Sequence, residues 1–330
     1  MAQETASTLP SVPSFSTLTP GDHPDHPYSV WPSSSPTSPS NPLGRLVLLT
    51  PAVVKLALQE VQTGERVSLD LPISEEYQPL GRKACRREVI RIDGGPATKQ
   101  EADEKGEVWN PVHDDVLHIN TQSYPGSGLF YHGATSEDVL SGQTNDGYAA
   151  IAEAGGILGR GVLVDYARWA AKNGIAYDPC LESHSIPLAV VQQIANEAKI
   201  EFRVGDILVL RTGFETRHNE LVAAGQRSRI VGKYVGLDQG EATLRWLWET
   251  GFSAVVGDHP AFECWPPPPG QLPLHSVLLS GWGLPIGELF SLDKLATALA
   301  RHERSTFLFT AVPLKVVKGI ASTGNAIAIL

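Results

Sequence analysis

The feature that most restricts the fold is an alternation of apolar and amphipathic segments in the second half of the chain. The apolar runs 161–166, 205–213 and 252–258 have the length and composition of strands. The segments between them, 187–200 and 239–251, have the residue spacing of amphipathic helices. Strands that are apolar throughout and separated by helices are typical of a sheet buried on both faces. The sequence therefore predicts an α/β domain.

A composition boundary divides the chain. Residues 1–42 are dense in Ser, Pro and Thr, a composition that buries too little apolar surface to offset the entropy of ordering. We expect an extended or partly disordered arm there. Residues 43–330 show no repeat and no second boundary, so we expect a single domain. Within it, Thr50 as N-cap and Pro51 as first helical residue predict a helix that stops by Gly64.

Charge, cysteine content and hydropathy argue against several classes of protein. The 36 acidic residues outnumber the 26 Lys and Arg residues, and the formal net charge of −10 disfavours nucleic acid as a partner. The cysteines form no CxxC pair, so neither a zinc knuckle nor a disulfide framework is indicated. No window approaches the roughly 18 apolar residues of a membrane span, and the first residues lack a leader-like run. We expect a cytoplasmic protein with no membrane partner.

Two polar clusters lie on this α/β background. The first is an irregular loop that ends at His132. In the second, Asp258 and His259 end a predicted strand, and His275 and Glu288 flank an apolar segment. Polar groups at the carboxyl ends of strands are where open α/β sheets usually bind ligands. The sequence therefore places the candidate site in these two clusters.

The second cluster resembles the closing signature of a known enzyme family. Residues 274–296, LHSVLLSGWGLPIGELFSLDKLA, are similar to that of the cyclase superfamily, which includes kynurenine formamidase and isatin hydrolase and is best known for metal-dependent hydrolases. Five further segments are also similar to the family, so that the resemblance spans residues 43–330. These segments are 43–73, 159–170, 203–215, 252–266 and 322–330. The resemblance implies the swivelling β/β/α fold of that family, a mixed sheet with flanking helices.

The resemblance also implies a site. In the family loop HxGTHxDxxxH, the first two histidines and the aspartate bind a divalent cation, and the last histidine is the acid/base. A branch common in fungi resembles NTQSSSQWDGLRH instead. On this chain Gln122, Gly126 and Gly128 take the ligand positions and His132 takes the acid/base position. A catalytic divalent site takes about three protein ligands, so a neutral amide and two glycines predict that no metal is bound.

The family's remaining two ligands match His275 and Glu288. Without a metal they would form an imidazole and carboxylate pair, in which the carboxylate fixes the ring tautomer. An imidazole titrates at about pH 6.5, so His132 can transfer protons at neutral pH. We predict His132, His275 and Glu288 as catalytic residues. The predicted substrate-binding residues are Gln122, Tyr124, Asp258 and His259.

These residues predict a metal-independent cyclase, dehydratase or isomerase that acts on a small carbonyl-bearing metabolite in fungal secondary metabolism, without a cofactor. One alternative is an amide or lactone hydrolase in which His275, Glu288 and Gln122, with His132, hold zinc or manganese. The other is a noncatalytic protein that keeps the pocket as a small-molecule receptor. The resemblance further implies a homo-oligomer with active sites near subunit contacts.

Overall fold

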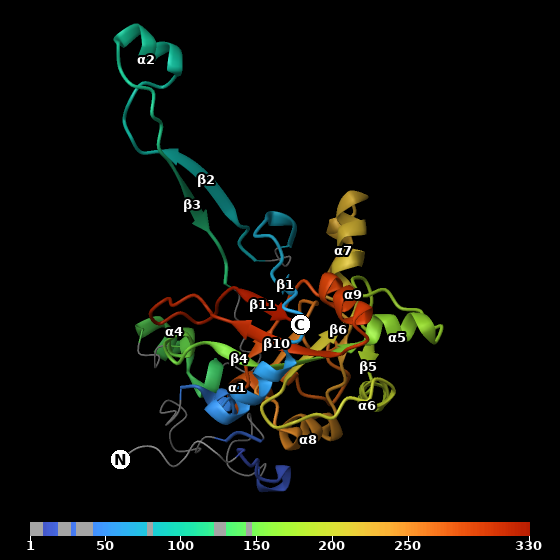
Figure 1. The fold of residues 1–330 in the computed structure, drawn as a ribbon. Helices are drawn as coiled ribbons and strands as arrows, with labels where there is room; N and C mark the ends of the chain where they lie inside the picture. Colours follow the sequence, from blue (N-terminus) through green and yellow to red (C-terminus); the bar gives the residue numbers. More distant parts are fainter. Residues whose placement is uncertain (1–8, 19–27, 31–41, 78–81, 122–129, 143–146) are drawn as a thin grey trace, which may run out of the picture. The chain divides into compact units, whose positions relative to one another are not determined.

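The computed structural model describes residues 9–18, 28–30, 42–77, 82–121, 130–142 and 147–330 (Figure 1). The chain forms two compact units. One comprises residues 1–71 and 121–330, and the other comprises residues 72–120. The smaller unit lies within the range for which the sequence predicted a single domain.

A seven-stranded mixed sheet forms the centre of the larger unit, in agreement with the α/β prediction. Its strand order is β1, β11, β10, β4, β6, β8, β9, in which β4, β6, β8 and β9 run parallel and the other neighbours antiparallel. The three predicted strands are confirmed as β4, β6 and β8. The bounds are β1 Arg66–Ser68, β4 Ile157–Asp165, β6 Ile207–Arg211, β8 Ala254–Gly257, β9 Ile286–Gly287, β10 Thr306–Ala311 and β11 Ala326–Ile329.

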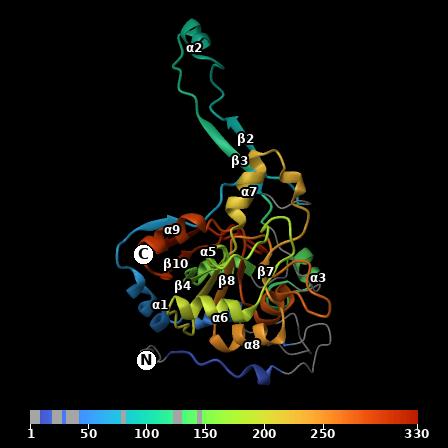
Figure 2. The same cartoon turned by 90° about the vertical axis from the view of Figure 1, so that its right-hand side faces the viewer.

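Helices cover both faces of this sheet. One face packs on α5 (Tyr166–Lys172), α6 (Leu188–Glu197) and α8 (Glu241–Thr250). The other packs on α4 (Gly147–Glu153) and α9 (Asp293–Arg301), and Figure 2 shows α9 across the strands from α6 and α8. Both predicted helices are confirmed as α6 and α8. Burial of both faces explains why the central strands are apolar throughout.

Shorter elements complete the larger unit. They are α1 (Pro51–Ala57), α3 (Ser136–Ser141), α7 (Phe214–Ala223) and the paired strands β5 (Ser185–Ile186) and β7 (Gly236–Leu237). The helix α1 begins as predicted, with the Thr50 side chain accepting from the Val53 amide, but it ends at Ala57, well before Gly64. Among the described residues, no helix combines the length and apolarity needed to cross a membrane.

Part of the N-terminal arm packs on the rest of the larger unit. Phe15 is only 2% exposed, and its ring lies 4.9 Å from that of Tyr28 and 6.4 Å from that of Trp282. The indole of Trp282 donates to the carbonyl oxygen of Tyr28 at 2.8 Å, and that of Trp248 donates to the carbonyl oxygen of Pro13 at the same distance. A few aromatic side chains thus supply apolar contacts that the average composition of the arm does not indicate.

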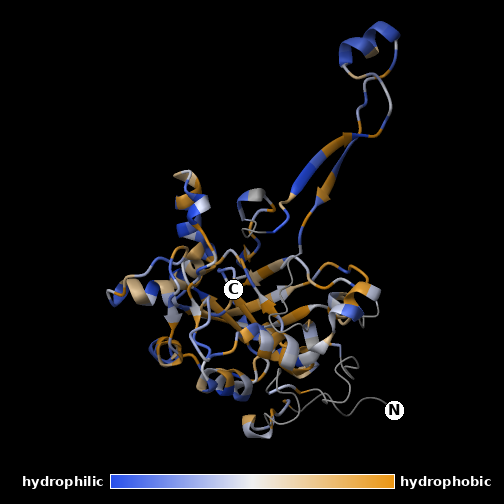
Figure 3. Cartoon of the chain, turned by 180° about the vertical axis from the view of Figure 1, so that it is seen from behind, coloured by the Kyte–Doolittle hydropathy of each residue, from blue (hydrophilic) through white to orange (hydrophobic). Residues whose placement is uncertain are grey.

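The smaller unit is a two-stranded antiparallel ribbon with one helix. Its strands are β2 (Arg86–Arg91) and β3 (His113–His118), and its helix is α2 (Lys99–Lys105). The Thr98 side chain caps the start of α2, and Gly106 ends it with φ +66°, a left-handed conformation that favours glycine. Figure 3 shows α2 as mostly hydrophilic, whereas the two strands carry hydrophobic stretches.

Candidate functional site

The polar strand ends lie at one edge of the sheet. Because β4, β6, β8 and β9 are parallel, their carboxyl ends share that edge. Asp165 and Arg211 are the last residues of β4 and β6, and Asp258 and Glu288 directly follow β8 and β9. The structure therefore brings the second polar cluster to the edge where open α/β sheets usually bind ligands.

A row of three ionisable groups, Glu263, His275 and Glu288, includes one of these strand ends. The Nδ1 of His275 lies 2.8 Å from each carboxylate oxygen of Glu263, and the His275 backbone amide donates to the same carboxylate at 3.2 Å. The Nε2 of the ring lies 3.1 Å from Oε1 of Glu288. The Glu263 side chain is fully buried, whereas that of Glu288 is 16% exposed. The row therefore runs from the interior toward its more accessible end at Glu288.

The neighbouring groups of the row shift the pKa values of His275 and Glu263 in opposite directions. Burial disfavours a charged ring, but the carboxylates of Glu263 and Glu288 outweigh it and hold the pKa of His275 well above its ordinary value. Burial also disfavours an ionised Glu263, but His275 outweighs it and lowers the pKa of that carboxyl. The surroundings of the ring thus favour its protonated form. Glu263 is a second carboxylate partner of the ring, at Nδ1, and tautomer control by Glu288 stays a prediction.

A π-helix, Ser276–Gly281, links the two predicted catalytic residues His275 and Glu288. All six of its residues are buried. The chain then passes through Trp282 into β9, which ends directly before Glu288. π-Helical turns are rare and are frequently found at functional sites. This local geometry allows residues 13 positions apart in the sequence to meet, and the hydrophobic pattern predicted only an apolar segment there.

The backbone of His132 lies close to this π-helix. Residues Tyr131–Gly133 form a 3-10 turn that packs against the π-helix. The hydroxyl of Tyr131 donates to the carbonyl oxygens of Leu43 and Gly283, at 3.0 Å in each case. Gly283 belongs to the segment between the π-helix and β9, so the structure brings the end of the first polar cluster to the second. The side chain of His132 lies outside the part that the structure describes.

Two tyrosines interact electrostatically with Glu288. Burial raises the pKa of Tyr148 to about 12, and the charge of Glu288 contributes. Burial also raises the pKa of Tyr234, again with a contribution from Glu288. Both phenols stay neutral at physiological pH and can donate hydrogen bonds. Sequence reasoning missed both residues, because a single tyrosine outside a motif carries no recognisable signal.

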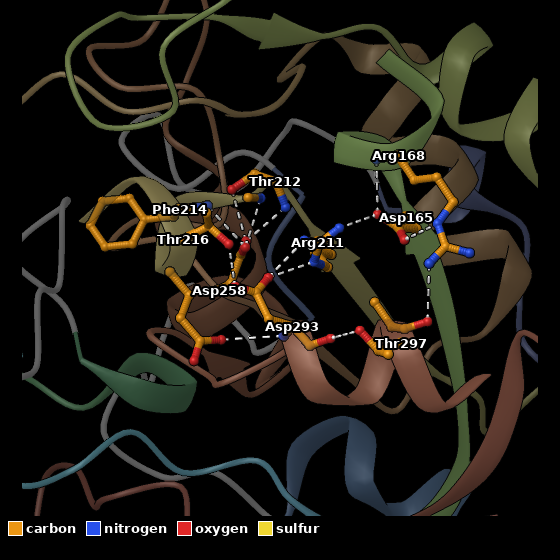
Figure 4. Close-up of polar contacts among 12 residues, drawn as sticks. Asp165, Arg168, Arg211, Thr212, Phe214, Thr216, Asp258, Asp293 and Thr297 are labelled. Atoms are coloured by element: carbon orange, nitrogen blue, oxygen red, sulfur yellow. Dashed lines mark hydrogen bonds and ion pairs between the residues drawn. The ribbon is translucent and has the colours of Figure 1, made fainter. Parts of the chain in front are cut away.

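Asp258 and His259, which we predicted to bind substrate, are fully buried. The Asp258 carboxylate accepts hydrogen bonds of 2.8 to 3.1 Å from the backbone amides of residues 212–214 and from a threonine hydroxyl (Figure 4). His259 places Nδ1 3.3 Å from Asp258 and Nε2 3.0 Å from the carbonyl oxygen of Phe262. These contacts hold the turn between β6 and α7 against the end of β8. Substrate binding by the two residues stays a prediction.

An ion-pair cluster around Arg211 holds the neighbouring strand ends. Its guanidinium donates to Asp165 at 2.8 Å and lies 2.7 Å from Asp293, the first residue of α9 (Figure 4). Burial disfavours the charge, but the two carboxylates outweigh it and raise the pKa of Arg211. Sequence reasoning missed this cluster, because its partners are 46 and 82 residues away along the chain.

The residues that the structure describes do not by themselves supply the donor set of a tightly bound divalent cation. Among the described residues, no group of three His, Cys, Asp or Glu side chains could hold a metal ion. Because Glu263 occupies Nδ1 of His275, the described part offers that ring's Nε2 and one carboxylate as strong donors. The predicted loop residues Gln122 and Tyr124, and the two glycines at family ligand positions, lie outside the described residues. A catalytic zinc site takes about three protein ligands, and a neutral amide is a weak third.

Comparison with known proteins places the fold. No family model matches the sequence, and no curated protein matches it. The chain is similar to a solved structure described as a novel cyclase, with a TM-score of 0.71 and 26% identity over 88% of this chain and 96% of that chain. It also resembles isatin hydrolase A from Ralstonia solanacearum, with a TM-score of 0.47 and 14% identity over 83% of this chain and 93% of that chain. For isatin hydrolase A from Labrenzia aggregata, bound to benzyl benzoate, the TM-score is 0.48 and the identity is 17%, over 84% of this chain and 96% of that chain. The predicted cyclase fold is thus confirmed.

Proposed function

From the cyclase fold and the buried row at its sheet edge, we propose that this protein is a metal-independent cyclase, dehydratase or isomerase acting on a small carbonyl-bearing metabolite. The observation that carries the proposal is the row Glu263, His275 and Glu288. The buried carboxylate of Glu263 contacts Nδ1 of the His275 ring. Nε2 of the same ring faces the partly exposed carboxylate of Glu288. The loop resemblance supports a place in fungal secondary metabolism.

The row can move a proton without a metal. Nε2 of the His275 cation can donate to a carbonyl oxygen or a leaving hydroxyl that binds beside Glu288. The Glu288 carboxylate can accept a proton from the carbon next to that carbonyl. Positioned proton transfer contributes on the order of 10² to 10⁴ in rate, which suffices for a reactive carbonyl compound but not for a stable amide. The neutral hydroxyls of Tyr148 and Tyr234 can stabilise charge that develops on oxygen.

Residues outside the described part complete the proposed site. His132 would be the proton shuttle, which is supported by the packing of its turn on the π-helix. Gln122 would donate a hydrogen bond to the substrate and Tyr124 would contact it. The contacts of Asp258 and His259 hold the turn at the strand ends, where the two residues would bind the substrate.

Complementation of a gene deletion tests the proposal. We expect the substrate to accumulate in the deletion strain and in strains carrying Glu288→Gln or His275→Gln, because each variant removes one proton-transfer group. Glu220→Gln is the matched control, since that side chain is 59% exposed and lies on α7. It should restore the product. Restoration by Glu288→Gln and His275→Gln to the wild-type level would contradict the proposal and favour the receptor alternative.

Metal analysis distinguishes the hydrolase alternative. Protein purified without chelator should contain far less than one zinc or manganese per chain, because the described part of the site offers too few strong donors and the loop sequence has a neutral amide and two glycines at the other ligand positions. Stoichiometric zinc or manganese would instead favour the amide or lactone hydrolase.

A further inference from the structure

The segment that follows Glu288, residues 289–293, leaves the sheet in an unfavourable backbone conformation. Leu289 has φ +56°, in the left-handed region that residues other than glycine rarely adopt. Such a residue persists only where its surroundings determine the conformation, and such residues cluster at active sites. Because Glu288 directly precedes this turn, the contacts that hold the segment also set where the Glu288 carboxylate lies.

Backbone hydrogen bonds hold the beginning of the segment. The Leu289 amide donates to the carbonyl oxygen of His259 at 3.2 Å, and the Phe290 amide donates to that of Gly257 at 3.1 Å. Gly257 is the last residue of β8. These bonds tie the beginning of the segment to the end of that strand.

The first turn of α7 holds the end of the segment through one carboxylate. Oε1 of Glu215 accepts from the hydroxyl of Ser291 at 2.9 Å, and Oε2 accepts from the backbone amide of Asp293 at 3.2 Å. Because Ser291 is only 7% exposed, its hydroxyl depends on a protein partner. Both oxygens of Glu215 act as acceptors, which an ionised carboxylate allows and a glutamine amide does not. Glu215 therefore bridges two points of the segment.

The position of Glu215 is itself fixed at the end of β8. The Asp258 carboxylate accepts from the backbone amide of Phe214, the residue before Glu215, at 3.1 Å (Figure 4). The side chain of Phe214 belongs to a small buried apolar cluster against which Leu289 packs. A continuous set of contacts thus runs from β8 through the start of α7 to the residues that follow Glu288.

A small shift of the segment would change the contact between Glu288 and His275. Oε1 of Glu288 lies 3.1 Å from Nε2 of the ring. A displacement on the order of 1 Å can lower a rate by about 100-fold. We propose that Glu215 is a positioning residue, which through Ser291 holds the Glu288 carboxylate at the ring. This inference rests on the proposed function, in which the Glu288 carboxylate accepts a proton from the substrate.

Hydrogen exchange tests the structural part of this role without a substrate. Ser291→Ala removes the donated hydroxyl, and Glu215→Gln replaces one acceptor oxygen with an amide. In both variants the amides of residues 289–293 should exchange at least about 10-fold faster, because they open locally. Residues 157–165 of β4 should keep their exchange rates. Glu220→Gln is the matched control, since it makes the same substitution on the same helix at a side chain that is 59% exposed.

Turnover of the metabolite that accumulates in the deletion strain tests the catalytic part. Ser291→Ala should lower kcat by about 10- to 100-fold and change KM by less than about 2-fold, because the Glu288 carboxylate acts in the transition state. Ser291→Thr keeps a hydroxyl and should recover most of the lost kcat. Circular dichroism gives the folded fraction of each variant, so that kcat refers to folded protein alone.

The outcomes separate this role from the proposed function. Unchanged exchange of residues 289–293 in both variants would overturn the role of Glu215, whatever their turnover. Faster exchange with an unchanged kcat in Ser291→Ala would also overturn it, provided that Glu288→Gln is inactive. If Glu288→Gln turns over the metabolite at the rate of the unmodified protein, the proposed function fails and the role of Glu215 fails with it.

Discussion

Two fully buried carboxylates near the end of β8 show how neighbouring residues of one charge type take different roles. The oxygens of Asp258 accept from backbone amides, which fixes a turn. The oxygens of Glu263 face the Nδ1 of His275 and leave the other ring nitrogen for Glu288. Burial of both carboxylates is tolerated because each has several hydrogen-bond donors. Only the second arrangement leaves a proton-transfer group near a partly exposed side chain.

The stability of the row should depend on pH. The pKa of Glu263 is lower in the folded state than its ordinary value of 4.5, so its stabilisation is present above that value and lost as the pH falls through the folded pKa. The pKa of His275 is raised above 6.5, so its stabilisation is present below that value and lost as the pH rises through the folded pKa. Urea unfolding should therefore show a stability maximum between these two limits.

Glu263→Gln should reduce the acid-side loss of stability, because it removes one of the buried carboxylates whose pKa is lowered. At pH 7 it should lower the free energy of unfolding by about 3 to 5 kcal/mol, the usual effect of removing one partner of a buried ion pair. Glu220→Gln, an exposed residue, should change it little. Equal acid-side losses in Glu263→Gln and in the unmodified protein would show that Glu263 is not the group that titrates.

The sequence predicted part of the site at this scale. His275 and Glu288 were expected to pair, and their atoms lie 3.1 Å apart. Glu263 was missed, because a local pattern does not show which ring nitrogen a distant carboxylate will reach. Its one available signal was a charged residue inside the apolar run AFEC that follows a strand. Buried charged residues need a partner, and a search for one could have led to His275.

At the scale of elements, the hydrophobic pattern predicted the longer helices and strands, whose apolar residues recur at a regular spacing. The segments that became β4, β6, β8, α6 and α8 were all expected, because burial of whole faces leaves a strong signal. The two-residue strand β9 and the π-helix before it were not expected. Their conformations depend on tertiary packing against β8 and the arm, and the sequence of a few residues does not encode that.

Arg211 holds the ends of β4 and β6 to the start of α9, so its removal should affect several elements together. Arg211→Ala should lower the free energy of unfolding by about 3 to 5 kcal/mol, because Asp165 and Asp293 would be left without their shared cation. Arg86→Ala is the control, since its ion pair with Glu88 is exposed and contributes little. Chemical unfolding of both variants checks this, and similar stabilities would contradict the role given to the cluster.

At the scale of the whole molecule, average composition did not indicate which residues of the N-terminal arm pack against the rest of the chain. Phe15 is buried against Tyr28 and Trp282, and Trp282 directly follows the π-helix. Phe15→Ala should therefore lower the free energy of unfolding by about 3 to 5 kcal/mol. Leu9→Ala, in the same arm but at a side chain that is 58% exposed, should have a much smaller effect. Equal effects of the two substitutions would mean that the arm does not pack stably in solution.

The most direct test of the account is the turnover of the accumulated metabolite by purified protein, with and without exhaustive chelation. Proton transfer by His275 and Glu288 predicts the same rate in both samples. It also predicts a loss on the order of 10² to 10⁴ in Glu288→Gln. A rate that disappears on chelation and returns with added zinc or manganese would contradict the central claim that the row works without a resident cation.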